Sequence, residues 1–307
     1  MDQKQNRMGV GLLAGASTGI FWGLPFLVPQ LLKHYSASDI AFGRFFFFGV
    51  VSLFFIPQVV RILRSLGRKD LLKIVLLSAS GFWFYSDLLF WAIQRTDGVI
   101  ASLILGLLPI TIPLFTPGKR RGGAQFYLGL LLILVGLLSL FCFPILSGMR
   151  EVRHPAPIGI FALLVCLALW TTFAISNSRF LQSHPEIPKK DFSSVMGILS
   201  LLFMTPIFLT GVNLVEFTGR TEFPLYLLCS IGLGFGSSWL ANWLWNICSF
   251  YCPSEISGTL LVFETIFGLL YSFGFEHRLP FGFEFTSIIL FLGGVLLSVT
   301  AQIKASR

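Results

Sequence analysis

The chain has 307 residues, of which 55% are hydrophobic and only 12% charged, and 34 of them are phenylalanine. A soluble domain carries about a quarter charged residues, so this composition excludes a soluble protein and predicts an integral membrane protein. The net charge of +8 does not indicate nucleic-acid binding, because membrane proteins concentrate Lys and Arg in their cytoplasmic loops. At ~30 residues for each helix and its loop, the length accommodates about ten spans and no soluble domain.

Hydropathy and polar breaks predict an all-α protein with ten transmembrane helices. They lie near residues 8–32, 38–59, 71–93, 97–116, 124–146, 157–182, 192–212, 223–249, 255–275 and 283–303. The first apolar stretch is too long for a signal-peptide core and no cleavage site follows it, so we take it as the first span. With the N-terminus inside, fourteen Lys and Arg fall on the cytoplasmic side and six on the other. Both termini are therefore expected to be cytoplasmic.

The two halves of the chain resemble each other. At an offset of 156 residues, Trp83 falls on Trp239 and residues 101–103 fall on 257–259. We therefore expect two five-helix repeats, residues 1–150 and 151–307. Because five is odd, related repeats must insert in opposite directions, an arrangement found in transporters with a substrate site between the halves. Chance similarity of apolar segments is the alternative.

The eighth predicted span carries a polar and aromatic face. Trp239, Asn242, Trp243 and Asn246 follow the i, i+3, i+4, i+7 spacing of one helix face. The repeat offset maps this face onto four residues of the third span: Trp83, Ser86, Asp87 and Phe90. Buried amides need partners in hydrocarbon, so these faces either line a cavity or form hydrogen bonds between helices.

Proline and tryptophan mark two further places. Pro25 in the first span and Pro109 in the fourth each have a second proline four residues later. Each proline removes a backbone N–H donor and leaves a carbonyl oxygen without its helical partner. That oxygen either binds a substrate ammonium, or the proline simply kinks the helix. Trp22 lies one turn before Pro25 and corresponds to Trp170, whose helix face also carries Phe173 and Asn177.

Arg44, Asp87 and Glu264 are ionisable residues inside predicted spans. Such charges are costly in a bilayer and therefore indicate function. Counting 1.5 Å per residue, Arg44 and Asp87 each lie ~9 Å below the outer ends of their helices. The equal depth allows an ion pair between them, and binding of a substrate carboxylate by Arg44 is the alternative. Glu264 lies close to the middle of the membrane.

Several short segments resemble the drug/metabolite transporter superfamily of the EamA type. The signature of its second repeat is similar to two segments of this chain, Glu264-Thr265-Ile266-Phe267 and Gly274-Phe275-Glu276-His277-Arg278. Thr265 stands where that pattern has proline. Phe42-Gly43-Arg44-Phe45 and Leu108-Pro109-Ile110 resemble first-repeat elements, although the first repeat lacks the Gly-Glu-Arg step. The aromatic content is most similar to the YddG-type aromatic amino acid exporters.

The resemblance implies a secondary transporter in the bacterial inner membrane that exports small amphipathic metabolites, above all aromatic and apolar amino acids. We expect Arg44, Asn242 and Asn246 to hold a carboxylate, Glu264 or Asp87 an ammonium, and the tryptophans to stack on the side chain. No cofactor or metal is expected, and no oligomer is required. The alternatives are a drug or nucleotide-sugar carrier of the same superfamily, a membrane-embedded enzyme, and a structural subunit.

Overall fold

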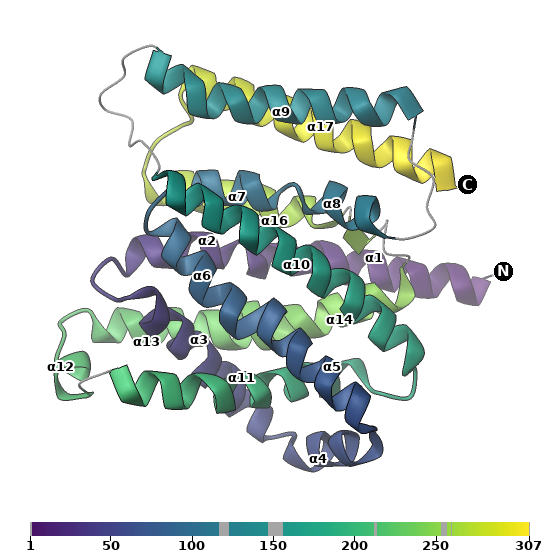
Figure 1. Ribbon diagram of the computed structural model, residues 1–307, viewed down its shortest axis with the longest axis vertical. Coiled ribbons are helices and arrows are strands. Elements are labelled where there is room, and N and C mark those ends of the chain that lie inside the picture. Colours follow the sequence, from purple (N-terminus) through teal and green to yellow (C-terminus); the bar gives the residue numbers. More distant parts are fainter. Residues whose placement is uncertain are drawn as a thin grey trace.

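The computed structural model describes residues 2–116, 123–146, 156–211, 214–252, 257–258 and 260–306, and the elements formed within these ranges are all helices (Figure 1). The first half contains α1 (Asp2–Trp22), α2 (Leu24–Leu31), α3 (Ala37–Leu53), α4 (Ile56–Ser65), α5 (Arg68–Ser78), the π-helix η1 (Ala79–Trp83), α6 (Phe84–Ile93), α7 (Gly98–Leu105), α8 (Leu108–Phe115) and α9 (Gly123–Leu146). The second half contains α10 (Pro157–Ser183), α11 (Lys189–Gly211), α12 (Leu214–Thr218), α13 (Phe223–Ile231), the π-helix η2 (Gly232–Leu240), α14 (Ala241–Tyr251), α16 (Val262–Phe275) and α17 (Gly282–Ser306).

Five helical stretches in the described ranges are long and apolar enough to cross a membrane: Met8–Leu31, Arg68–Ile93, Pro157–Ser183, Lys189–Thr210 and Phe223–Tyr251. The bent pair α3 and α4 adds a sixth candidate, and four shorter apolar helices lie in α7–α8, α9, α16 and α17. These helices fall where the hydropathy predicts spans. The number of ten spans and the cytoplasmic position of the termini stay predictions, and the charged loops 117–122 and 147–155 lie outside the described residues.

The second span differs from its predicted extent of residues 38–59. Helix α3 ends at Leu53, and the chain turns by 89° into α4. Pro57 lies in the first turn of α4, where its missing N–H costs no helix hydrogen bond. Val59 and Ile62 of α4 are buried, whereas Arg61 and Arg64 are exposed. This two-sided pattern is typical of a helix that lies along a membrane surface.

Prolines interrupt two of the spans, as the sequence predicts. Helix α1 gives way at Gly23 to α2, which has Pro25 in its first turn, and α7 gives way to α8, which has Pro109 in its first turn. Both prolines are buried. Each break brings backbone groups that lack their usual helical partners into the interior of the bundle.

The helices of the two halves pack in reciprocal pairs. Helix α3 packs on α11, α7 on α16 and α9 on α17, and the contact of α1 with α14 has its counterpart in the contact of α10 with α6. Figure 1 shows α9 and α17 side by side at one edge of the bundle. The π-helices η1 and η2 also lie at corresponding places, since η1 ends at Trp83 and η2 contains Trp239. π-Helical turns are rare and are frequent at functional sites.

Glycines allow η2 to pass close to the backbone of α3. A Cβ atom on Gly234 would lie 2.7 Å from the carbonyl oxygen of Arg44 and 2.8 Å from the amide nitrogen of Phe48. Neither backbone atom is able to move aside without shifting the helix. This close approach sets the position of Arg44 relative to η2.

Gly234→Val should therefore destabilise the protein. Overpacking of this kind costs about 1–3 kcal/mol, which should lower the melting temperature in detergent by several degrees. Gly232→Val is the matched control, because a Cβ atom on Gly232 would meet no described atom within 4 Å. Equal melting temperatures for the two variants would contradict the tight contact between η2 and α3.

Candidate functional site

A small pocket lies in the interior of the bundle, where residues from five of the predicted spans meet. It encloses about 20 Å³, and its lining comprises Trp22, Pro25, Arg44, Gly81, Phe82, Tyr85, Leu89, Trp170, Phe173 and Glu264. This space holds about one water molecule. The pocket is therefore too small for any molecule larger than water in this structure.

Arg44 is a buried cation in this pocket, and it lies on α3. Its Nε donates to the hydroxyl of Ser238 at 2.7 Å, and its Nη1 donates to the hydroxyl of Ser86 at 3.1 Å. Ser238 lies on η2 and Ser86 on α6, so the guanidinium joins helices from both halves of the chain. A guanidinium has five N–H donors, and its two hydrogen bonds to hydroxyls leave donors for an anionic ligand.

Of the two alternatives for Arg44, the ion pair with Asp87 is not formed among the described residues. In the described structure, Asp87 accepts a hydrogen bond from Ser38 at 2.7 Å. Asp87 directly follows Ser86 on α6, and one residue turns a helical side chain by about 100°, so Asp87 points toward Ser38 at the start of α3 and not toward the guanidinium. The neighbouring residue, Ser86, takes the place beside the guanidinium. Equal distances from two helix ends therefore do not imply that two side chains face each other.

Glu264 supplies a carboxylate to the same pocket. It lies in the first turn of α16, where the amide groups and dipole of the helix favour a negative charge. Its side chain is buried, and its Oε2 has no hydrogen-bond partner among the described residues. A buried carboxylate oxygen without a partner carries a large desolvation cost. Glu264 is therefore placed to accept a proton or a cationic ligand.

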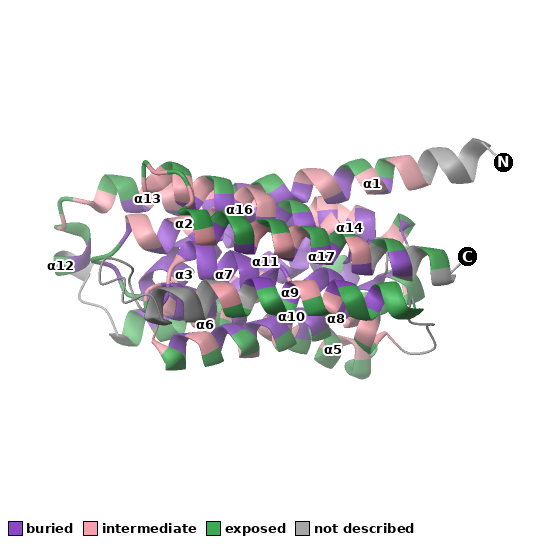
Figure 2. Ribbon diagram, turned by 90° about the horizontal axis from the view of Figure 1, so that it is seen from above, coloured by how far each residue is buried: buried purple, intermediate pink, exposed green. Residues whose placement is uncertain are grey.

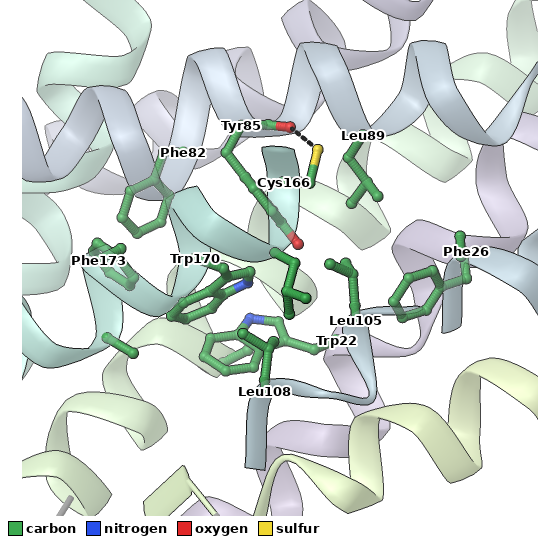
Figure 3. Packing of buried hydrophobic residues seen from close by; sticks show 14 of the residues in the cluster. Trp22, Phe26, Phe82, Tyr85, Leu89, Leu105, Leu108, Cys166, Trp170 and Phe173 are labelled. Carbon is green, nitrogen blue, oxygen red and sulfur yellow. Dashed lines mark hydrogen bonds between the residues drawn. The ribbon is translucent and has the colours of Figure 1, made fainter. Parts of the chain in front are cut away.

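Three indole rings cluster beside these charged groups. The ring centroids of Trp22 and Trp170 are 5.0 Å apart, and Trp245 lies 5.2 Å from Trp22 and 5.9 Å from Trp170. Trp22 Nε1 donates to the carbonyl oxygen of Ser237 at 3.0 Å. Figure 3 shows Trp22 and Trp170 gathered with the ring of Tyr85 in the core. The cluster gives the site an aromatic wall drawn from both halves of the chain.

The predicted polar face of the eighth span lies mainly against neighbouring helices. Trp239 Nε1 donates to Ser194 Oγ at 3.1 Å, and Asn242 Nδ2 donates to Ser193 Oγ at 3.1 Å. Asn246 accepts from Asn177 Nδ2 at 3.1 Å. In this structure the polar face therefore forms hydrogen bonds between helices and does not line the pocket. Trp243 is half-buried and lies 5.5 Å from Trp239 between ring centroids.

The corresponding face of the third span also lies mostly outside the pocket. Ser86 reaches Arg44, whereas the half-buried Trp83 stacks on Phe203 with ring centroids 5.5 Å apart. Phe90 is fully buried in the core and does not line the pocket. Pro109 is buried at the break before α8 and is likewise absent from the pocket lining.

Five of the predicted site residues thus line one pocket: Trp22, Pro25, Arg44, Trp170 and Glu264. The site residues predicted from the sequence did not include Tyr85 or Trp245, whereas Phe173 was placed on the helix face of Trp170. Tyr85 gave no signal among the many aromatic residues of the spans. Trp245 follows Asn242 by three residues, so its place on the same turn of the helix was a signal for it.

A larger cavity of about 850 Å³ lies near the loops at the ends of α2, α6 and α16. Its lining includes Asp97, Glu276, Arg278 and Glu284. Arg278 Nε donates to Glu276 Oε2 at 2.6 Å, and its Nη2 donates to Glu284 Oε1 at 2.9 Å. This cavity is charged, whereas the central pocket is mainly aromatic.

Asp97 lies in the loop before α7 and accepts a hydrogen bond from the amide of Ile100 at 2.7 Å. Burial raises the pKa of its carboxyl from 3.8 to about 6. The folded state therefore binds a proton more tightly than the unfolded state, and this residue's contribution to stability falls as the pH rises from about 4 to about 6.

Asp97→Asn should relieve that cost, because asparagine also caps helices but carries no charge. The gain in the free energy of unfolding of the variant over the parent protein should therefore be larger at pH 8 than at pH 4. For a pKa shift of about two units, the two gains should differ by up to about 3 kcal/mol. Thermal unfolding in detergent at both pH values measures the difference. A difference in melting temperature that is the same at pH 4 and pH 8 would contradict this assignment.

The comparisons with known proteins agree with this architecture. Residues 9–142 match the EamA-like transporter family. The chain is similar to the inner membrane protein YtfF of Escherichia coli strain K12, with 29% identity over 319 aligned positions and 95% of each chain covered. It is also similar to the uncharacterized transporter YetK of Bacillus subtilis strain 168, with 23% identity, covering 83% of this chain and 76% of YetK.

A solved crystal structure shares the fold, with a TM-score of 0.67 and 16% identity, and the match covers 97% of this chain and 99% of that one. Together, the family match and the similar proteins support a membrane transporter rather than an enzyme. The family match, the similarity to an inner membrane protein and the apolar helices identify a multi-pass protein of the bacterial inner membrane.

Proposed function

We propose that the protein is a secondary transporter that exports small amphipathic metabolites, with aromatic and other apolar amino acids as its substrates. The observation that carries the proposal is the central pocket, which combines a buried arginine, a buried carboxylate with an unpartnered oxygen and an aromatic wall. A zwitterion with an aromatic side chain complements all three parts.

In the proposed complex, Arg44 binds the substrate carboxylate. A guanidinium binds a carboxylate through two parallel hydrogen bonds, which are stronger than its present bonds to the hydroxyls of Ser86 and Ser238. Glu264 binds the ammonium group with its unpartnered oxygen. Trp22 and Trp170 pack on the side chain, because aromatic rings bury a large apolar area and stack on one another.

Transport then requires the closed pocket to open to each side of the membrane in turn. We propose that residues 1–150 and 151–307 form two inverted repeats that rock around the pocket. The reciprocal packing of the helices and the matching π-helices η1 and η2 support this proposal. Arg44 joins the halves through Ser238, so substrate binding at Arg44 changes a contact between them.

Counterflow in liposomes that contain the purified protein tests the substrate class. The panel contains labelled phenylalanine, tryptophan, leucine and glutamate, the lipophilic cation tetraphenylphosphonium and a uridine-diphosphate sugar. We expect phenylalanine, tryptophan and leucine to exchange and to compete with one another. Exchange of only the drug-like cation or only the nucleotide sugar would contradict the amino acid proposal and favour another branch of the superfamily. Protein-free liposomes are the control.

A further inference from the structure

A third cavity lies on the outer face of the bundle, between α5 and α10. It encloses about 690 Å³, and the residues that matter most in its lining are Lys73, Leu76, Leu77, Thr172, Arg179 and Phe180. Helices α5 and α10 contact each other along this line. Figure 2 shows exposed residues along both helices. We refer to this cavity as the lateral groove.

The mouth of the lateral groove carries two cations at similar depth. Lys73 lies five residues after the start of α5 at Arg68, and Arg179 lies four residues before the end of α10 at Ser183. At 1.5 Å per residue these positions are ~7 Å and ~6 Å from the two helix ends. His184 Nε2 lies 3.8 Å from Asp70 Oδ2, which shows that the two ends lie side by side.

The charges at the mouth leave an excess of positive charge. Asp70 Oδ1 accepts a hydrogen bond from Lys73 Nζ at 2.8 Å and so offsets the charge of Lys73. Arg179 is exposed and forms no ion pair with any residue that the structure describes. An exposed arginine in a membrane span is costly unless its head group reaches the interface or an anion. Arg179 is therefore the principal anion-binding group of the groove.

The interior of the lateral groove is suited to a hydrocarbon chain. Leu76 is 59% exposed although it lies in a membrane span, so it faces lipid. Leu77 and Phe180 form an apolar floor. The groove ends close to the central pocket, because Thr172 lines the groove while the next residue, Phe173, lines the pocket.

We propose that the lateral groove binds an anionic phospholipid. Its phosphate lies between Arg179 and Lys73, and one acyl chain lies along Leu76 and Leu77. A zwitterionic lipid would bring its own cation toward these two side chains, so the site prefers anionic lipids such as phosphatidylglycerol. This inference does not depend on which solute the central pocket binds.

Lipid retention by the purified protein, measured by native mass spectrometry, tests the proposal with phosphatidylglycerol and phosphatidylcholine as the probes. The protein should retain phosphatidylglycerol preferentially. Arg179→Gln should weaken that retention by about fivefold, the factor that corresponds to about 1 kcal/mol for a basic residue near an anionic lipid. Lys73→Gln should weaken it less, because Asp70 already offsets the charge of Lys73. Arg179→Lys should keep most of it.

Two further variants separate the groove from general surface charge. Arg64→Gln removes an exposed cation of α4 that does not line the groove, so retention should be unchanged. Thr172→Trp fills the groove without changing its charge and should reduce retention as Arg179→Gln does. Equal retention of both lipids by the parent protein, or unchanged retention in Arg179→Gln and Thr172→Trp, would overturn the proposal.

Discussion

Glu264→Gln is expected to insert into the membrane normally and to lose most of its amino acid transport. Glutamine has nearly the same shape but cannot form the charge-assisted hydrogen bond to an ammonium group. Such a bond contributes about 1.5–3 kcal/mol, so phenylalanine binding should weaken by about 10- to 100-fold. Counterflow and equilibrium binding in liposomes measure both effects.

The matched control is Glu186→Gln, which removes the same charge from an exposed position in the loop before α11. It should transport at the parental rate. Parental transport by Glu264→Gln at every pH tested would mean that this carboxylate only packs against its neighbours and takes no part in substrate binding.

Arg44→Gln should weaken amino acid binding by at least tenfold while leaving the binding of decarboxylated amines nearly unchanged. The guanidinium supplies two parallel donors to a carboxylate, and a glutamine amide supplies a single weaker contact. The amide is still able to bond to Ser86 or Ser238, so the helices should remain joined. Binding of phenylalanine and of phenethylamine to the same variant measures the effect.

Asp87→Asn is the control for Arg44. Because Asp87 bonds to Ser38 and not to Arg44, it should change neither ligand's affinity by more than about twofold. For the same reason, exchanging the charges of Arg44 and Asp87 should not restore binding. If Arg44→Gln weakened the binding of phenylalanine and phenethylamine equally, Arg44 would maintain the structure and would not bind the substrate carboxylate.

Some parts of the site were predictable from the sequence because they are unusual in a membrane. A charge such as Arg44 or Glu264 stands out in an apolar stretch, since it needs a specific partner there. The breaks before Pro25 and Pro109 were predictable because proline removes a helix hydrogen bond. Tyr85 of the pocket was not predictable, because an aromatic residue in an apolar helix packs equally well in the core.

Other features depend on packing that helical spacing does not encode. Asn242 and Asn246 were correctly placed on one polar face, but spacing does not reveal whether that face meets a cavity or another helix. The 89° turn after α3 follows Leu53 inside an apolar run, where hydropathy gives no break. The π-helices η1 and η2 also have no sequence signature, because the wider turn is selected by the neighbouring helices.

The most direct test of the central claim compares three ligands that share one aromatic ring: phenylalanine, phenethylamine, which lacks the carboxylate, and 3-phenylpropionate, which lacks the ammonium group. In the parent protein, the affinities of the three ligands are measured by competition against labelled phenylalanine. In Arg44→Gln and Glu264→Gln, the affinity of each ligand is measured by direct binding. The account predicts that Arg44→Gln weakens phenylalanine and 3-phenylpropionate but spares phenethylamine, and that Glu264→Gln weakens phenylalanine and phenethylamine but spares 3-phenylpropionate. If each variant weakens all three ligands equally, or if neither changes any of them, the central pocket is not the substrate site.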